Sequence, residues 1–362
     1  MRKLNPKNER IKREYLAYLT DAKRQSEKTV DQVAAALSAF EAYTRHKEFR
    51  LFHIEQAKGF KQHLAKQVNE ATGKPLAIAT IHSRLMALKA FFQWLAGRPG
   101  YRRISYGDAE YFNPSANDGR IASATREKPA PSLEQIRHVL STMPHATDIE
   151  KRNRALIAFT ILTGARDDAI ASLSIRNVNL TARVVEQDAR TVRTKNRKTF
   201  RTYFFPVGDD IEAIVADWLE RLRNVLHYGP DDPLFPKTRV AAVEGIGFSV
   251  VGLAREHWTN AQGIRTIFRE AFTAAGLPYF IPHSFRRTLA LLGEKTCTTP
   301  EVFKAWSQNL GHEGVLTTFT SYGAVADHRQ AEIISGMRNA PEAPDIEAMR
   351  QALAVLQKHI PL

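Results

Sequence analysis

Four short segments of this sequence carry side chains that could bind a phosphate and react with it. The first covers residues 162–170 and reads Leu-Thr-Gly-Ala-Arg-Asp-Asp-Ala-Ile. The apolar stretch that leads into it predicts a helix that ends at Gly164, which places Arg166 in the turn that follows. A planar guanidinium can bind two phosphate oxygens at once, which a lysine ammonium cannot. Taken alone, Arg166 could equally be an ordinary surface residue.

The second segment is strongly basic. Residues 190–201 hold six basic side chains and no acidic one: Arg190, Arg193, Lys195, Arg197, Lys198 and Arg201. Like charges can protect the edge of a sheet, but six within twelve residues repel one another, so a phosphate partner explains them better. A lysine that reaches into a desolvated groove could protonate a leaving oxygen. We favour Lys195 for this role, with Lys198 as the alternative, and expect Arg193, Arg197 and Lys198 to contact the phosphates of the partner.

The third and fourth segments lie near the end of the chain. Pro282 suits the first turn of a helix, so His283 and Arg286 would share one face near its N-terminus, where unpaired N–H groups already favour an anion. The pairing of imidazole and guanidinium predicts a phosphate site, whereas a lone histidine is more often a cap or a core residue. Leu310-Gly311-His312 follows, and Tyr322 stands ten residues after His312. A tyrosine beside a glycine is usually a packed aromatic, so Tyr322 alone does not indicate catalysis.

The elements that must position these residues are mostly helical. Ser132 to Gln135 forms a capping box that opens a helix after a polar, turn-rich stretch. Strand-like residues at 183–185, 191–193 and 202–205 predict a small antiparallel sheet, with a turn at 194–199 between the last two strands. Residues 228–262 show no clear period and are interpreted as an insertion. The predicted fold class is therefore mainly α with one small antiparallel β-sheet.

The first third of the chain combines helical patterns with an excess of positive charge. Apolar residues recur at helical spacing from Thr29, a potential cap, and again from Ile78 to Leu95, where Gly97 offers a left-handed stop. Lys and Arg exceed Asp and Glu by 52 − 38 = 14 overall, and by 22 − 12 = 10 within residues 1–120. This surplus favours a polyanionic partner. The basic side chains of this region that we expect to contact DNA are Lys58, Lys61, Arg84 and Lys89.

Other functional classes find no support in the sequence. No apolar run reaches the ~18 residues of a membrane span, and the charged N-terminus does not resemble a secretory signal. The single cysteine, Cys297, excludes an internal disulfide and a cysteine-based metal cluster. We expect a cytoplasmic, nucleoid-associated protein with no metal and no cofactor.

Taken in order, the four segments resemble the tyrosine recombinase (phage integrase) family. The shared pattern is an Arg after a helix-ending Gly, a hairpin Lys, His-x-x-Arg, Leu-Gly-His and a Tyr shortly after. The resemblance implies that Tyr322 is the nucleophile of a 3′-phosphotyrosine intermediate and that Arg166 and Arg286 clamp the phosphate. It further implies that His283 helps to take the tyrosine proton, that His312 hydrogen-bonds the phosphate, and that Lys195 protonates the leaving oxygen.

This sequence departs from the family pattern in three places. Ala169 stands where an acidic residue is common three positions after the first Arg, and Asp168 could take over its role. Arg287 replaces a frequent His. Tyr322 lies ten residues after His312 rather than the usual nine, and one extra residue turns a regular helix by about 100°.

The resemblance also implies an organisation and partners. We expect a helical core-binding domain at 1–117, a linker at 118–131, a catalytic domain at 132–338, and a C-terminal linker and amphipathic helix at 339–362 that could be exchanged between protomers. The expected partner is double-stranded DNA, bound by a homo-tetramer, with accessory DNA-bending proteins possible. Two alternatives are a DNA-binding protein of this fold that does not cleave DNA, and an enzyme that relaxes DNA like a type IB topoisomerase.

Overall fold

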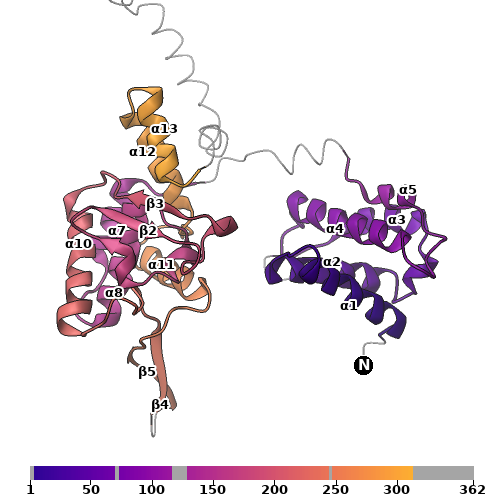
Figure 1. The fold of residues 1–362 in the computed structure, drawn as a ribbon, viewed down its shortest axis with the longest axis horizontal. Coiled ribbons are helices and arrows are strands. Elements are labelled where there is room, and N and C mark those ends of the chain that lie inside the picture. The colour runs from indigo at the N-terminus through magenta and orange to yellow at the C-terminus, as the bar shows by residue number, and fades with distance from the viewer. Residues whose placement is uncertain (1–3, 70–72, 116–128, 244–246, 313–362) are drawn as a thin grey trace, which may run out of the picture. The chain divides into compact units, whose positions relative to one another are not determined.

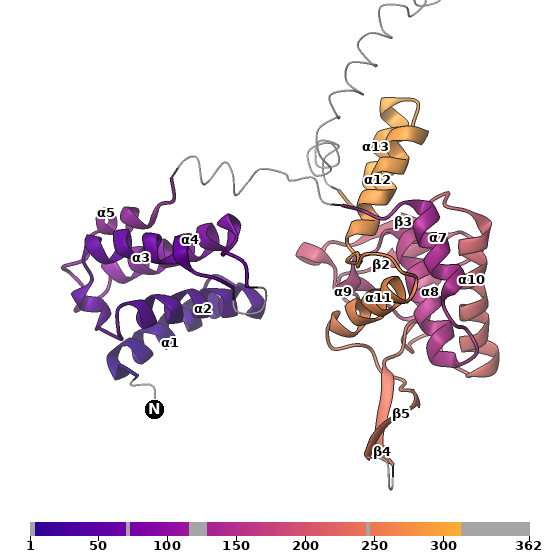
Figure 2. The ribbon, with the colours of Figure 1, turned by 180° about the vertical axis from the view of Figure 1, so that it is seen from behind.

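The computed structural model describes residues 4–69, 73–115, 129–243 and 247–312. The chain divides into two compact units, Met1–Ala124 and Thr125–Leu362. The division falls within the segment 118–131 that we expect to be the linker. Each unit is described by itself (Figures 1 and 2).

The first unit is built from helices. These are α1 (Pro6–Asp21), α2 (Glu27–Tyr43), α3 (Ile54–Lys66), α4 (Ile78–Ala96) and α5 (Tyr106–Ala109), with short 3-10 turns η1 (Phe49–Leu51) and η2 (Glu110–Phe112). Ser26, not Thr29, caps α2, because its side chain accepts a hydrogen bond from the Thr29 N–H. The helix predicted from Ile78 is confirmed, but Gly97 ends it at φ −82° rather than in the expected left-handed conformation.

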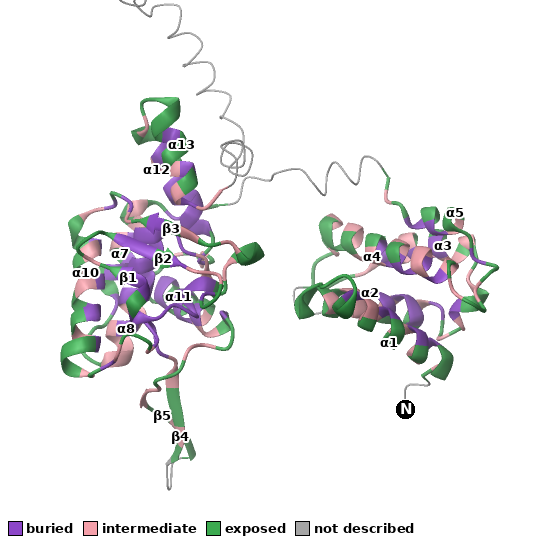
Figure 3. Ribbon diagram, viewed as in Figure 1, coloured by how far each residue is buried: buried purple, intermediate pink, exposed green. Residues whose placement is uncertain are grey.

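Aromatic side chains form the core of the first unit. The ring of Phe40 meets those of Phe60, Phe92 and Phe112 edge-on, with centroids 5.2, 5.5 and 5.5 Å apart. Edge-to-face contacts of this kind add to the free energy gained by burying the rings. The unit therefore has a hydrophobic core of its own (Figure 3).

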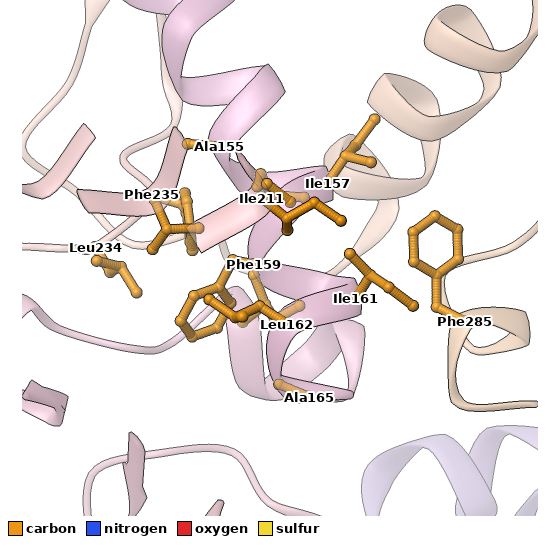
Figure 4. Close-up of a cluster of buried hydrophobic side chains, with 14 of the residues drawn as sticks. Ala155, Ile157, Phe159, Ile161, Leu162, Ala165, Ile211, Leu234, Phe235 and Phe285 are labelled. Carbon is orange, nitrogen blue, oxygen red and sulfur yellow. The ribbon is translucent and has the colours of Figure 1, made fainter. Parts of the chain in front are cut away.

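The second unit surrounds a buried helix. Its helices are α7 (Leu133–Thr142), α8 (Asp148–Thr163), α9 (Asp167–Ile170), α10 (Asp209–Glu220), α11 (Gln262–Ala274), α12 (Ser284–Thr296) and α13 (Pro300–Asn309), with the 3-10 turn η3 (Ile175–Asn177) and the π-helical turn η5 (Arg221–Val225). The capping box predicted at Ser132 and Gln135 is confirmed at the start of α7. Every residue of α8 from Ala155 to Thr163 is buried, since neighbours pack on all its sides, among them Ile211 and Phe285 (Figure 4).

A small antiparallel sheet lies in the second unit, in the order β1-β2-β3. Its strands are β1 (Val178–Asn179), β2 (Val184–Gln187) and β3 (Phe200–Tyr203), and Val185 pairs with both Val178 and Thr202. The strand predicted at 191–193 is wrong. The N–H groups of Thr191 and Val192 bond back to the Asp188 carbonyl, and the Arg193 N–H bonds to the Ser172 hydroxyl, so these residues form a turn.

Residues 228–262, predicted as an insertion without a clear period, contain two strands. Strands β4 (Thr238–Val243) and β5 (Gly247–Leu253) pair antiparallel into a two-stranded sheet. We call it the ribbon. It extends away from the rest of the second unit, at the end opposite α12 and α13 (Figures 1 and 2). In the part of the chain that the structure describes, no helix has the length and apolar character needed to cross a bilayer.

Candidate phosphate-binding site

The site begins at the turn that ends α8. Gly164 adopts φ 60°, which favours glycine, and the predicted helix stop is confirmed. A Cβ at this position would lie 2.9 Å from the Leu289 Cδ1 atom and 3.0 Å from the Leu310 Cδ2 atom, so space also requires glycine here. The turn leads directly to Arg166, which is half-buried and precedes α9.

Arg286 lies at the centre of the site. It is only 2% exposed, and its guanidinium donates to the Gly164 carbonyl at 2.7 Å and to the Leu310 carbonyl at 2.5 Å. It also lies 2.9 Å from Nε2 of His312. One side chain of α12 thus joins the end of α8 to the turn that follows α13. The two carbonyl groups orient the guanidinium, and its positive charge acts on the neighbouring His312.

His312 is held as a neutral ring. Burial and the positive charges of Arg286, Arg166, His283 and Lys198 lower its pKa to about 4. An arginine N–H can only donate, so Nε2 of His312 accepts, and the proton of the neutral ring is on Nδ1. The imidazole can therefore act as a hydrogen-bond donor at neutral pH.

The same electrostatic effect shows which predicted residues the fold brings together. Arg166, Lys198 and the pair His283 and Arg286 come from three separate segments, yet all four residues are close enough to His312 to lower its pKa. His283 is exposed at the N-cap of α12, which begins at Ser284, so Pro282 precedes the helix instead of lying in its first turn. Tyr322 lies outside the described residues.

The two candidate lysines differ in position. Lys195 is exposed and begins a short turn in which Asn196 and Arg197 have φ values of 58° and 51°. This left-handed pair reverses the chain, and Lys198 on its far side is half-buried and acts on His312. Of the two lysines of this turn, Lys198 is therefore the one whose charge acts on His312.

The basic segment 190–201 is partly neutralised by acids from outside it. Three ion pairs join Arg190 to Asp188 at 2.6 Å, Arg193 to Asp168 at 3.0 Å, and Arg201 to Glu186 at 2.9 Å. Acids from neighbouring segments thus offset three of the six positive charges. Arg197 remains exposed beside Lys195 at the tip of the turn.

Arg193 has a second contact that the sequence did not indicate. Besides its pair with Asp168, its guanidinium donates to the Trp258 carbonyl at 2.8 Å, and its N–H bonds to Ser172 at 2.9 Å. These contacts tie the lysine-bearing loop to α9, next to Arg166. Asp168, which we expected to steady the site, pairs with Arg193. Residues this far apart in the chain leave no local signal in the sequence.

Three of the four basic residues predicted to contact DNA in the first unit lie around residues 111–113, since Lys58 lies over the Tyr111 ring and Lys61 and Lys89 bond to Asn113. Lys58 pairs with Glu55 at 2.7 Å, and Lys89 pairs with Glu110 at 2.9 Å. Lys61 donates to the Asn113 carbonyl at 3.2 Å, and Arg84 is half-buried on α4. Across the described ranges, no group of three or more His, Cys, Asp and Glu side chains could hold a metal ion.

Comparisons with known proteins place the chain in a family. The phage integrase family model matches residues 132–329, and the phage integrase N-terminal SAM-like domain model matches residues 13–98. A tyrosine recombinase XerC of Lactobacillus leichmannii is 22% identical over 310 residues, which cover 75% of this chain and 96% of the relative. A XerC of Lactobacillus delbrueckii subsp. bulgaricus is 24% identical over 257 residues, or 68% of this chain and 73% of the relative.

Solved structures show the same fold. A lambda integrase (75-356) dimer bound to a COC′ core site covers 88% of this chain and 97% of its own, with a TM-score of 0.56 and 12% identity. The Tn1549 transposon integrase in complex with a circular intermediate DNA covers 90% of this chain and 99% of its own, with a TM-score of 0.58 and 14% identity. With the family model spanning more than half of its residues, this chain belongs to the phage integrase family.

Proposed function

We propose that this protein is a site-specific DNA recombinase that cleaves and rejoins DNA through a covalent 3′-phosphotyrosine intermediate. The observation that carries the proposal is the buried Arg286, whose charge is oriented by two carbonyl groups and surrounded by Arg166, His283, Lys198 and His312. Such a concentration of positive charge suits a phosphodiester whose negative charge grows in the transition state. The relatives are recombinases and integrases, two of them solved with DNA.

In the proposed reaction, a DNA phosphate is transferred from the 5′ oxygen to Tyr322. The Tyr322 hydroxyl oxygen attacks the phosphorus, the bond to the 5′ oxygen breaks, and His283 accepts the phenol proton. Arg166 and Arg286 hold the non-bridging oxygens, and neutral His312 donates a hydrogen bond to one of them. The 5′ oxygen leaves with a proton from Lys198, which we prefer to Lys195 because of its position near His312. The phosphodiester bond energy is kept in the tyrosyl ester, so rejoining needs no external energy source.

DNA exchange in this proposal needs more than one copy of the chain, and a homo-tetramer on two duplexes is the assembly we infer. Arg197 and Lys195 at the exposed turn would contact the DNA backbone beside the cleaved phosphate. The same residues would serve an enzyme that only relaxes DNA, so strand exchange between two labelled duplexes separates these two functions.

Covalent trapping tests the proposal. Full-length wild-type protein, Tyr322→Phe and the matched control Tyr203→Phe would be incubated with fragments that flank the gene, each nicked to prevent rejoining. Tyr203 is 57% exposed on β3 and has no role in the proposed reaction. We expect an SDS-resistant protein–DNA adduct from wild type and Tyr203→Phe, and none from Tyr322→Phe. Protected fragments that yield no adduct with wild type would instead identify a DNA-binding protein that does not cleave.

A further inference from the structure

One face of the ribbon is apolar and exposed. Val240 pairs with Val250 and Ala242 pairs with Phe248, so these four side chains lie on the same side. Val240 is 56% exposed, Val250 60% and Phe248 85%. An exposed group of large apolar side chains of this kind marks an interaction surface. We call these four residues the apolar ribbon face.

The base of the ribbon is firmly held. Arg152 of α8 is 1% exposed, and its guanidinium donates to the Pro236 carbonyl and, at 2.9 Å, to the Thr238 hydroxyl, where β4 begins. The guanidinium also lies over the Trp258 ring, 5.0 Å from its centroid. Burying a charged side chain is costly unless it is well hydrogen-bonded. The buried Arg152 cation thus fixes the start of β4, from which the ribbon extends. The apolar ribbon face is therefore anchored to α8 at its base.

The charge of the ribbon argues against DNA as its partner. Residues 238–253 contain one basic side chain, Arg239, and one acidic side chain, Glu244. Binding to a nucleic acid draws on cations that replace condensed counterions, and a neutral ribbon offers none in excess. An apolar, uncharged face fits another protein surface of the same character, and such a face is complementary to itself.

The size of the face indicates when such a contact can form. The two strands have six and seven residues, about half of which point to one side. A stable interface takes about 20–30 residues from each partner. The ribbon alone is therefore too small to hold two copies together in solution, but it suffices where DNA already holds them side by side at high effective concentration.

The geometry points to a contact between copies of this chain: the apolar ribbon face packs against the same face of a second copy bound next to it on DNA. This inference rests on the proposed function for the presence of two copies on one duplex, but not for the cleavage step. Figure 3 shows the ribbon as exposed along most of its length.

Cooperative DNA binding tests the contact. Full-length wild type, Val250→Asp and Ser249→Asp would be titrated onto two random-sequence duplexes, one long enough for a single copy and one for two, with bound copies counted by mass photometry. Ser249 pairs with Ala241 on the opposite face of the ribbon and is the matched control. We expect Val250→Asp to lose at least about tenfold in cooperativity on the longer duplex, with unchanged affinity for the shorter one. Ser249→Asp should match wild type.

Either of two results would overturn the inference. One is wild-type cooperativity in Val250→Asp. The other is a fall in single-copy affinity, which would mean that the ribbon binds DNA itself. Thermal unfolding should show equal midpoints for both aspartate variants, since both positions lie on the ribbon surface.

Crosslinking checks the geometry directly. In a Cys297→Ser background, Phe248→Cys should form oxidised dimers on the two-copy duplex, whereas Ser249→Cys should not. Absence of dimers from Phe248→Cys in complexes with two bound copies would rule out the face-to-face contact. Val250→Asp should still form the adduct on nicked DNA, and Tyr322→Phe should still bind DNA cooperatively. These two results distinguish a failure of this inference from a failure of the proposed function.

Discussion

The phosphate-binding site and the basic surface of the first unit, which carries Lys58, Lys61, Arg84 and Lys89, both contain clustered cations. The groups that accept hydrogen bonds from these cations differ between the two regions. Arg286 in the site donates to the carbonyl groups of Gly164 and Leu310. Lys89 on the first unit pairs with the Glu110 carboxylate, and Lys58 pairs with Glu55. A carbonyl dipole orients a cation and leaves its net charge intact, whereas a carboxylate cancels that charge.

This difference separates a cation oriented by neutral groups from two surface lysines whose charge a carboxylate offsets. The loop at 188–201 shows both situations within one segment, because Arg193 is paired with Asp168 while Lys198 contributes positive potential at His312. A count of basic residues thus overstates the attraction to DNA wherever acids from other segments lie beside them. The partner of each cation is more informative than the number of cations.

The largest effect should come from Arg286→Lys, which keeps the charge but loses the planar fork. A lysine cannot donate to both Gly164 and Leu310 and also orient two phosphate oxygens. We expect the rate of adduct formation to fall by at least about 10³-fold, since each lost donor to the developing charge costs roughly 10²–10³. Each buried carbonyl left without a donor should also reduce the free energy of unfolding by about 1–3 kcal/mol.

Single-turnover trapping and chemical denaturation measure these two effects. Arg176→Lys is the matched control, because Arg176 pairs with Asp231 and its side chain is 53% exposed. A rate for Arg286→Lys within about threefold of wild type would show that the carbonyl-held cation does not carry the phosphate contact.

A smaller effect, about 10²-fold, is expected for Lys198→Ala. Lys195→Ala should change the rate much less, because Lys195 is exposed at the far side of the turn. Replacing the 5′ oxygen of the cleaved phosphate by sulfur gives a leaving group with a pKa of roughly 8.5, which departs without a proton. This substrate should restore the rate of Lys198→Ala. If it restored Lys195→Ala instead, the assignment of the two lysines would be reversed.

Local features of this protein could be predicted from its sequence, while long-range ones could not. Gly164 and the Ser132 cap follow from rules that involve residues within one helical turn. The choice between Lys195 and Lys198 depends on the left-handed pair at 196–197, and nothing in Asn-Arg demands that conformation. The pairing of Arg193 with Asp168 joins residues 25 positions apart.

The ribbon escaped prediction for a different reason. Both its faces are open to solvent over most of their length, so burial does not impose the alternation of apolar and polar residues by which strands are recognised. The predicted role of Tyr322 stays a prediction, as does the exchange of the C-terminal helix at 339–362, because those residues lie outside the described part of the chain.

The neutral state of His312 predicts a dependence of stability on pH. Its pKa of about 4 in the folded protein lies below the ordinary value of 6.5, so the unfolded chain binds the proton more readily between these values. Its contribution to stability is complete above pH 6.5 and is lost as the pH falls towards 4. Unfolding by denaturant at pH 7 and pH 4.5 should show this loss in wild type and a smaller one in His312→Gln.

An anion in the site should oppose this shift. A bound phosphate offsets the positive charges of Arg166, Arg286 and Lys198, so the pKa of His312 should rise towards its ordinary value. NMR titration of the imidazole with and without a short nicked duplex measures the change. An unchanged pKa in saturated complexes would mean that the phosphate does not lie beside His312.

The smallest effect concerns the first unit, where removing an acid should strengthen DNA binding. Hydrogen bonds from Lys89 and Asn113 lower the pKa of the Glu110 carboxyl, which is therefore ionised and opposes the charge of Lys89 at neutral pH. Glu110→Gln leaves Lys89 uncompensated, and we expect a few-fold gain in affinity for random duplex at low salt, with a salt slope steeper by about 1 or less. Lys89→Gln should produce the opposite, equally small change. The matched control Glu134→Gln lies on the second unit in the first turn of α7, where the carboxylate accepts hydrogen bonds from Ser132 and from its own backbone N–H. It should leave the affinity for DNA unaltered. If Glu110→Gln bound DNA no more tightly than wild type, Lys89 would not face DNA. The lysines of the basic surface would then serve only their contacts with residues 110–113.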